Sequence, residues 1–116
     1  MKIYLAGPMR GIPEFNFPAF YKAAAALRAQ AHFVFNPAEK DVEKHGKNFA
    51  KANATGNEEL AVKQYGFNLR EALEVDLVWI CRHADAIALL PGWKNSKGAT
   101  TEYALAIALG LSVIEL

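Results

Sequence analysis

The sequence predicts one α/β domain over residues 1–116, with a small Rossmann-like or flavodoxin-like parallel sheet of four to five strands flanked by helices. Short, continuously apolar runs alternate with segments of helical periodicity, as in parallel sheets buried on both faces. The 116 residues are 53% hydrophobic and 22% charged, which is enough for one core and too little for two. These two observations exclude disordered and fibrous classes.

The chain begins with a strand, a helix and a second strand. Lys2 to Ala6 is an apolar run ended by Gly7-Pro8, the pattern of a buried strand followed by a turn. Asn16 can cap a helix that runs to about Gln30 through an alanine-rich body. His32 to Phe35 form the second strand, which Asn36-Pro37 closes. The opening therefore predicts a βαβ unit.

The middle of the chain, from Ala38 to Glu59, is polar and has no sustained apolar period, so a loop, a frayed helix or a lid remain open there. A helical pattern follows from about Glu58 to His83 and is interrupted near Gly66. The remaining elements are a strand, a helix and a strand, at Ala86–Leu90, Ala99–Leu109 and Ser112–Leu116.

Charge and cysteine content exclude several classes of function. The formal net charge of +1 is far from the basic excess of proteins that bind nucleic-acid polymers. No apolar stretch approaches the ~20 residues of a membrane helix, and the N-terminus lacks a signal-peptide core. Cys81 is the single cysteine and lies in the apolar run Leu77–Ile80, which predicts a buried helix face and a reducing, cytoplasmic compartment.

Metal chemistry is not expected. His32, His45 and His83 lack the spacing of metal ligands, and a single cysteine gives no zinc or iron–sulfur pattern.

Two loops at the carboxyl ends of predicted strands carry the candidate ligand-binding residues, because open parallel sheets bind ligands there. The first loop contains Gly7, which lets the backbone approach a ligand, and Arg10, a planar donor for a phosphate or carboxylate. A turn with a solvated arginine is the alternative.

The second loop, Pro91 to Glu102, is rich in donors and leads into a helix N-terminus, which favours an anion. Ser96 and Gly98 belong to this phosphate cradle. Glu102 either complements the helix dipole or takes part in chemistry. Trp93 either stacks on a base or packs on the surface.

Asp76 is a third candidate, because an acid among Val75, Leu77 and Trp79 needs a partner or a function if it is buried. The alternative places Asp76 on a solvated stripe of its helix.

Together these segments resemble the nucleoside 2-deoxyribosyltransferase-like superfamily. This superfamily includes 2'-deoxynucleoside 5'-phosphate N-hydrolases and many small uncharacterised phage and bacterial proteins. The resemblance is carried by Tyr4–Gly11, by Asp76, by Asp85–Ala88 and by Ser96–Glu102 with the alanine-rich helix that follows. It does not cover residues 38–66.

The resemblance implies cleavage of a nucleoside or nucleotide N-glycosidic bond without a cofactor. Glu102 matches the family's carboxylate nucleophile, Asp76 its acid partner, and Tyr4 a residue lining the sugar pocket. Asp85 matches a family aspartate near the base, although a structural role is equally open. Residues Gly7, Arg10, Ser96 and Gly98 match positions around the 5'-phosphate in the monophosphate hydrolases. A homodimer or larger assembly is also implied.

The chemistry requires two carboxyls with different pKa values. One carboxylate captures an oxocarbenium-like carbon while a second acid protonates the departing base. We expect burial to raise the pKa of Asp76, and donors near the helix N-terminus to keep Glu102 ionised.

Three functions are weighed on this basis. The first is a glycosidase or deoxyribosyltransferase acting on a (deoxy)nucleoside or nucleoside 5'-monophosphate. The second is a non-catalytic module that binds or sequesters a nucleotide. The third is a phosphoribohydrolase, because Pro91-Gly92 and the Gly98–Glu102 spacing match part of that family's loop, although the loop is longer here.

Overall fold

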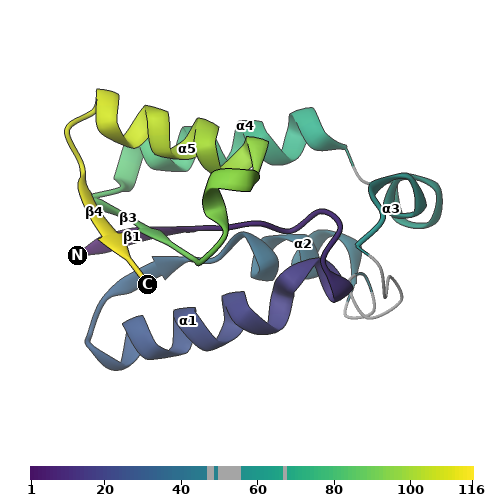
Figure 1. The fold of residues 1–116 in the computed structure, drawn as a ribbon, viewed down its shortest axis with the longest axis horizontal. Helices are drawn as coiled ribbons and strands as arrows, with labels where there is room; N and C mark the ends of the chain where they lie inside the picture. The colour runs from purple at the N-terminus through teal and green to yellow at the C-terminus, as the bar shows by residue number, and fades with distance from the viewer. Residues whose placement is uncertain (47–48, 50–55, 67) are drawn as a thin grey trace.

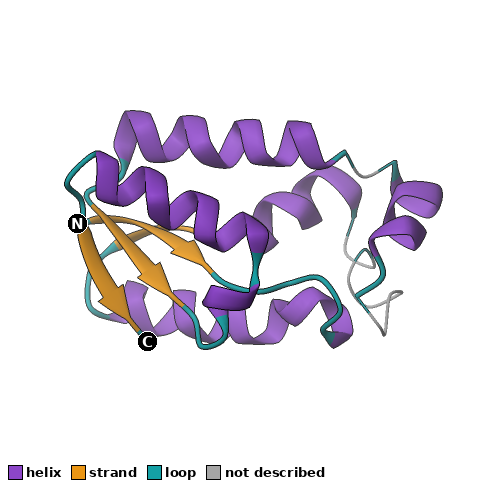
Figure 2. Cartoon of the chain, turned by 45° about the horizontal axis from the view of Figure 1, so that its top comes forward, coloured by secondary structure: helices purple, strands orange, loops and turns teal. Residues whose placement is uncertain are grey.

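The computed structural model describes residues 1–46, 49, 56–66 and 68–116 and shows an α/β sandwich (Figure 1). Its strands are β1 (Lys2–Ala6), β2 (Phe33–Phe35), β3 (Ala86–Leu89) and β4 (Ser112–Glu115). They form one parallel sheet in the order β2-β1-β3-β4, which runs between two layers of helices (Figure 2). The predicted small, parallel, Rossmann-like fold is confirmed.

The helices are α1 (Phe17–Ala29), α2 (Pro37–His45), α3 (Glu58–Tyr65), α4 (Leu69–His83) and α5 (Lys97–Ala108). The interruption expected near Gly66 is confirmed, because Gly66 ends α3 in the left-handed conformation at φ 67°. The middle segment, left open from the sequence, contributes α2 and the start of α3; residues 47–48 and 50–55 of it lie outside the described residues.

Side chains of β1 alternate between the two faces of the sheet. Ile3 and Leu5 pack with Phe20 of α1 in one core, and Tyr4 packs with Ile80 of α4 and with α5 in the other. Figure 1 shows α4 and α5 on one side of the sheet and α1 on the other. Tyr4 is therefore held on the side of the sheet that α4 and α5 cover.

The strand order places a crevice between β1 and β3. The chain leaves β1 toward β2 on one side and later returns to β3 on the other, so the loops after β1 and β3 diverge at this point. A hydrogen bond from the Leu90 amide to the Ala6 carbonyl, 2.8 Å long, joins the two strand ends. Both loops singled out from the sequence therefore meet at one edge of the sheet.

Between β1 and α1 the backbone makes a left-handed turn. Glu14, Phe15 and Asn16 have φ values of 54°, 52° and 61°, a conformation that non-glycine residues adopt at an energetic cost. Asn16 stands at the start of α1, but its side chain does not cap the helix as expected. Its amide instead donates a 3.0 Å hydrogen bond to the Pro8 carbonyl, which ties the loop after β1 to α1. The left-handed conformation of Asn16 prevents the usual capping geometry.

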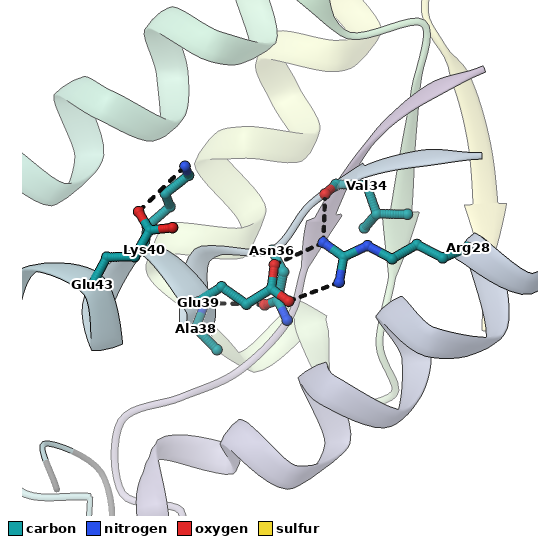
Figure 3. A network of polar contacts seen from close by, with 7 residues as sticks. All are labelled: Arg28, Val34, Asn36, Ala38, Glu39, Lys40 and Glu43. Carbon is teal, nitrogen blue, oxygen red and sulfur yellow. Dashed lines mark hydrogen bonds and ion pairs between the residues drawn. The ribbon is translucent and has the colours of Figure 1, made fainter. Parts of the chain in front are cut away.

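The position of α2 is fixed by Arg28, which reaches from α1 (Figure 3). The Arg28 guanidinium donates hydrogen bonds of 2.7 Å to both carboxylate oxygens of Glu39 and one of 2.9 Å to the Val34 carbonyl. The Asn36 side chain caps α2 by accepting a 3.0 Å hydrogen bond from the Ala38 amide. This network holds α2 against both α1 and β2.

The predicted burial of Cys81 is wrong, because the side chain is exposed. The face of α4 that packs on the sheet contains Ile80, and Cys81 is turned about 100° from it. Val75 and Val78 are also exposed. The apolar run around Cys81 therefore covers more of the helix circumference than the sheet buries.

Within the described part of the chain, every helix is too short or too polar to cross a membrane. Those same residues include no group of three or more His, Cys, Asp or Glu side chains arranged to hold a metal ion.

Candidate active site

A cavity lies at the carboxyl edge of the sheet and is called the main cavity below. Tyr4, Asp76 and Glu102 line it on the side of α4 and α5. Apolar side chains line the rest of it, among them Met9, Phe15, Phe20, Phe49, Leu69 and Leu73. The cavity thus combines acidic groups with a largely apolar surround, as ligand sites commonly do.

Tyr4, Asp76 and Glu102 come together in this cavity, as the resemblance implies. The Tyr4 hydroxyl donates a 2.6 Å hydrogen bond to Glu102 Oε2, with Tyr4 fully buried and Glu102 only 6% exposed. Asp76 lines the same cavity, and its carboxyl is electrostatically coupled to both groups. Three distant segments, β1, α4 and α5, each contribute one of these groups. Asp76 therefore faces the cavity rather than the solvated stripe of α4.

Burial dominates the electrostatics of the three groups. It raises the pKa of both carboxyls, and the negative charge of Asp76 raises the pKa of Glu102 further. The pKa of Tyr4 is also raised, first by burial and then by Glu102 and Asp76, so the hydroxyl stays neutral and acts as a donor. The two carboxyls consequently share a proton at neutral pH.

The structure differs from the expectation that Glu102 stays ionised. Glu102 lies in the second turn of α5, beyond the free amide groups of the first turn, and Tyr4 is the group that lowers its pKa. Burial and the charge of Asp76 outweigh the hydrogen bond from Tyr4, so the pKa of Glu102 lies above its ordinary value.

The N-terminus of α5 borders a second cavity beside the main one, lined by Arg10, Ser96 and Gly98 among others. Ser96 caps α5, because its Oγ accepts a 3.1 Å hydrogen bond from the Ala99 amide, and its own hydroxyl hydrogen remains available to a ligand. Added side-chain atoms at Gly98 would meet nothing closer than Ser96 Oγ at 3.9 Å. This open helix N-terminus suits an anion.

Arg10 lies at the rim of both cavities and forms an ion pair with Glu58 of α3, with 2.6 Å between Nε and Oε2. The Gly11 amide also donates a 3.1 Å hydrogen bond to the Gly56 carbonyl just before α3. A Cβ on Gly56 would lie 2.3 Å from the Ile12 carbonyl oxygen, so only glycine fits this contact. The start of α3 is thus attached to the loop that carries Arg10.

Gly7 lines the main cavity, but its immediate role is in packing. A Cβ on Gly7 would lie 2.7 Å from Leu90 Cβ, closer than two side chains can approach. The absence of a side chain at Gly7 lets the loops after β1 and β3 meet.

Two predicted ligand-binding residues do not join the others. Asp85 lies at the opposite, amino edge of the sheet, where its Oδ2 accepts a 2.8 Å hydrogen bond from the Lys2 amide. This contact fits the structural role that the sequence left open. Trp93 packs on Tyr103 of α5 with ring centroids 4.6 Å apart and does not line the main cavity. Its indole therefore belongs to the surface packing, not to a base-stacking site.

A family model described as "Domain of unknown function (DUF4406)" matches residues 1–115. The chain belongs to this family. No curated protein and no solved structure gave a significant match to the sequence. The family description assigns no activity, so function has to be argued from the site itself.

The family match also spans the segment outside the resemblance. This segment supplies a further ionisable group to the main cavity. Asp41 of α2 is half-buried at the cavity, and burial followed by the charge of Asp76 raises its pKa to about 7, although Lys44 opposes the shift. Sequence reasoning did not single out Asp41. A usable signal was present: Asn36-Pro37 starts a helix, and Asp41 then lies one turn beyond the buried Ala38.

Proposed function

We propose that this protein cleaves, or transfers a sugar at, the N-glycosidic bond of a (deoxy)nucleoside or nucleoside 5'-monophosphate, with Glu102 as nucleophile and Asp76 as proton donor. The observation that carries the proposal is the buried Tyr4–Glu102 hydrogen bond with Asp76 beside it, inside a cavity next to an open helix N-terminus. A nucleotide requires sites for a sugar, an anion and an apolar planar ring, and the two cavities offer each.

In the proposed reaction, the proton that Glu102 and Asp76 share is transferred to the departing base. In the reactive form Asp76 carries this proton and Glu102 is ionised, and the Tyr4 hydroxyl favours that form by stabilising the Glu102 carboxylate. Glu102 then bonds to the anomeric carbon while the C–N bond breaks. The electron pair of that bond goes to the base nitrogen, which takes the proton from Asp76.

Water or a second base completes the cycle. It attacks the anomeric carbon, gives its proton to the Asp76 carboxylate, and releases Glu102 as a carboxylate. An aqueous acceptor makes the protein a hydrolase, and a base acceptor makes it a transferase.

The anion site supports a 5'-monophosphate over a free nucleoside. The α5 N-terminus offers free amides, Ser96 offers a hydroxyl, and Arg10 adds a positive charge at the rim. A transferase of free nucleosides has less use for such a site.

The proposal includes a homodimer or larger assembly in the cytoplasm. It is supported by the resemblance and by apolar side chains that one chain leaves exposed on α4 and α5, namely Val75, Val78 and Ile107. Light scattering of the purified protein gives the mass in solution, and a monomer at micromolar concentration would contradict this part of the proposal.

The test is base release from a panel of deoxynucleosides and deoxynucleoside 5'-monophosphates, with and without a free acceptor base, followed by chromatography. We expect base release or exchange by the native protein and by Glu115→Gln, an exposed carboxyl on β4. Glu102→Gln should lose at least about 10³-fold in kcat. Ligands that bind but stay intact would favour the non-catalytic module, and retained activity in Glu102→Gln would reject the nucleophile.

A further inference from the structure

Asp41, Asp76 and Glu102 all line the main cavity. Asp41 and Asp76 also border a further cavity between α2 and α4 that Glu102 does not line, so Asp41 lies on the side of Asp76 away from Glu102. If Glu102 faces the anomeric carbon and Asp76 the departing nitrogen, Asp41 lies further along in the direction of the base. In that orientation of the ligand, the Asp41 carboxyl would meet the base edge remote from the sugar.

Asp41 makes no hydrogen bond or ion pair with another described residue. The two lysines of α2 pair elsewhere, Lys40 with Glu43 and Lys44 with Glu71. Among the residues that the structure describes, none donates a hydrogen bond to the Asp41 carboxyl or forms an ion pair with it. A half-buried carboxyl without a partner is destabilising, so its presence in a cavity points to a ligand.

The wall beside Asp41 is aromatic and apolar. Phe15 and Phe49 stack with centroids 5.4 Å apart and planes at 13°, and both line the main cavity. Leu69 and Leu73 add aliphatic surface. An apolar wall with the Asp41 carboxyl beside it suits a planar heteroaromatic ring that presents N–H groups at its edge.

Both sides of this subsite are held in place by the fold. The Arg28–Glu39 pair and the Asn36 cap fix α2, which carries Asp41 (Figure 3). The left-handed turn at Glu14–Asn16 orients Phe15. The carboxyl and the aromatic wall are therefore preorganised for a ligand rather than assembled by it.

We propose that Asp41 is the specificity-determining residue for the base, and that it selects a base edge with two adjacent N–H donors. A carboxylate accepts two parallel hydrogen bonds from such an edge. Among the common neutral bases guanine presents it, through N1–H and the 2-amino group. Hypoxanthine lacks the amino group and loses one of the two bonds. This inference rests on the proposed function for the orientation of the ligand.

The test compares 2'-deoxyguanosine and 2'-deoxyinosine 5'-monophosphates, which differ by that one amino group. Affinity is measured by calorimetry in the Glu102→Gln background, and kcat/KM for base release is measured in the native protein. We expect a preference for the guanine nucleotide of about tenfold or more, because the lost bond is to a charged group. The exposed neighbour Glu43, changed to Gln, is the matched control and should keep the preference.

Asp41→Asn should reduce the preference to about onefold or reverse it, because an amide can accept from N1–H but points its NH₂ at the 2-amino group. A preference that survives in Asp41→Asn, or that is absent from the native protein, overturns the inference. Base release without any preference leaves the proposed function standing. Preferential binding without release rejects the catalysis and keeps the role of Asp41, and no binding of either nucleotide rejects both.

Discussion

Tyr4 and Glu102 lie 98 positions apart in the sequence and are joined by a buried hydrogen bond of 2.6 Å. The bond connects the first strand to the last helix in the wall of the main cavity. Because the pKa of Tyr4 is raised by burial and by the two carboxyls, the hydroxyl remains a neutral donor across the physiological range. It is also the group that lowers the pKa of Glu102. Tyr4 therefore favours the ionised form of Glu102.

Removing this hydroxyl tests that role. Tyr4→Phe should lower kcat by about 10- to 100-fold and move the acid limb of the pH–rate profile to higher pH, because the pKa of Glu102 rises when its donor is lost. Tyr103→Phe, on α5 beside Trp93, is the control. An unchanged pH–rate profile in Tyr4→Phe would show that the hydroxyl does not act on Glu102.

Protein stability should fall as the pH rises, partly because of Asp41. Its folded pKa of about 7 lies above the ordinary value of 3.8, so the folded state holds a proton that the unfolded chain has released. The contribution is fully present below about pH 4 and is lost as the pH passes through about 7. Asp41→Asn should raise the free energy of unfolding at pH 8 by about 1–2 kcal/mol after allowance for solvent screening.

Urea unfolding between pH 4 and 8.5 provides the measurement. Glu43→Gln should follow the native curve, since Glu43 is exposed on the same helix. A native curve that is flat over this range would contradict the burial of Asp41.

Arg10 should act on the phosphate rather than on the chemistry. Arg10→Ala is expected to raise KM for monophosphates by about tenfold or more and to leave KM for nucleosides nearly unchanged. Glu58→Gln should lower KM for monophosphates, because it removes the negative charge that pairs with Arg10. Arg82→Ala, at an exposed position of α4, is the control. Equal effects of Arg10→Ala on both substrate classes would rule out the phosphate role.

The two glycines of the site should respond differently to an added side chain. Gly98→Val places atoms in open space at the α5 N-terminus, so stability should change by less than about 0.5 kcal/mol while monophosphate binding is lost. Gly7→Ala meets Leu90 and should destabilise the fold by about 1–3 kcal/mol. Thermal unfolding and calorimetry separate the two effects. Normal monophosphate affinity in Gly98→Val would place the anion elsewhere.

The sequence predicted those features of the fold and the site that depend on local residue patterns. The strands of the sheet were predictable from apolar runs bounded by glycine and proline, and strand polarity brought the loops of Arg10 and Ser96 to one edge. Asp85 was expected near the base only because it matches a position in the family that the sequence resembles. It precedes β3 and therefore lies at the amino edge of the sheet, away from the main cavity. The prediction that Cys81 is buried was wrong because hydrophobicity alone does not tell which part of an apolar helix faces the sheet. Asp41 was not predicted as a site residue because α2 is polar and only its first residues are buried.

The residues that line the main cavity come from two separate parts of the chain, so ligand choice and reaction type can change independently during divergence or engineering. Tyr4, Asp76 and Glu102 come from β1, α4 and α5, whereas Asp41, Phe49 and Glu58 come from the stretch between β2 and α4. That stretch can be exchanged as one continuous cassette without altering a residue of the Tyr4–Asp76–Glu102 group. Ligand choice in such chimaeras should therefore follow the inserted cassette, while reaction type follows the scaffold that receives it.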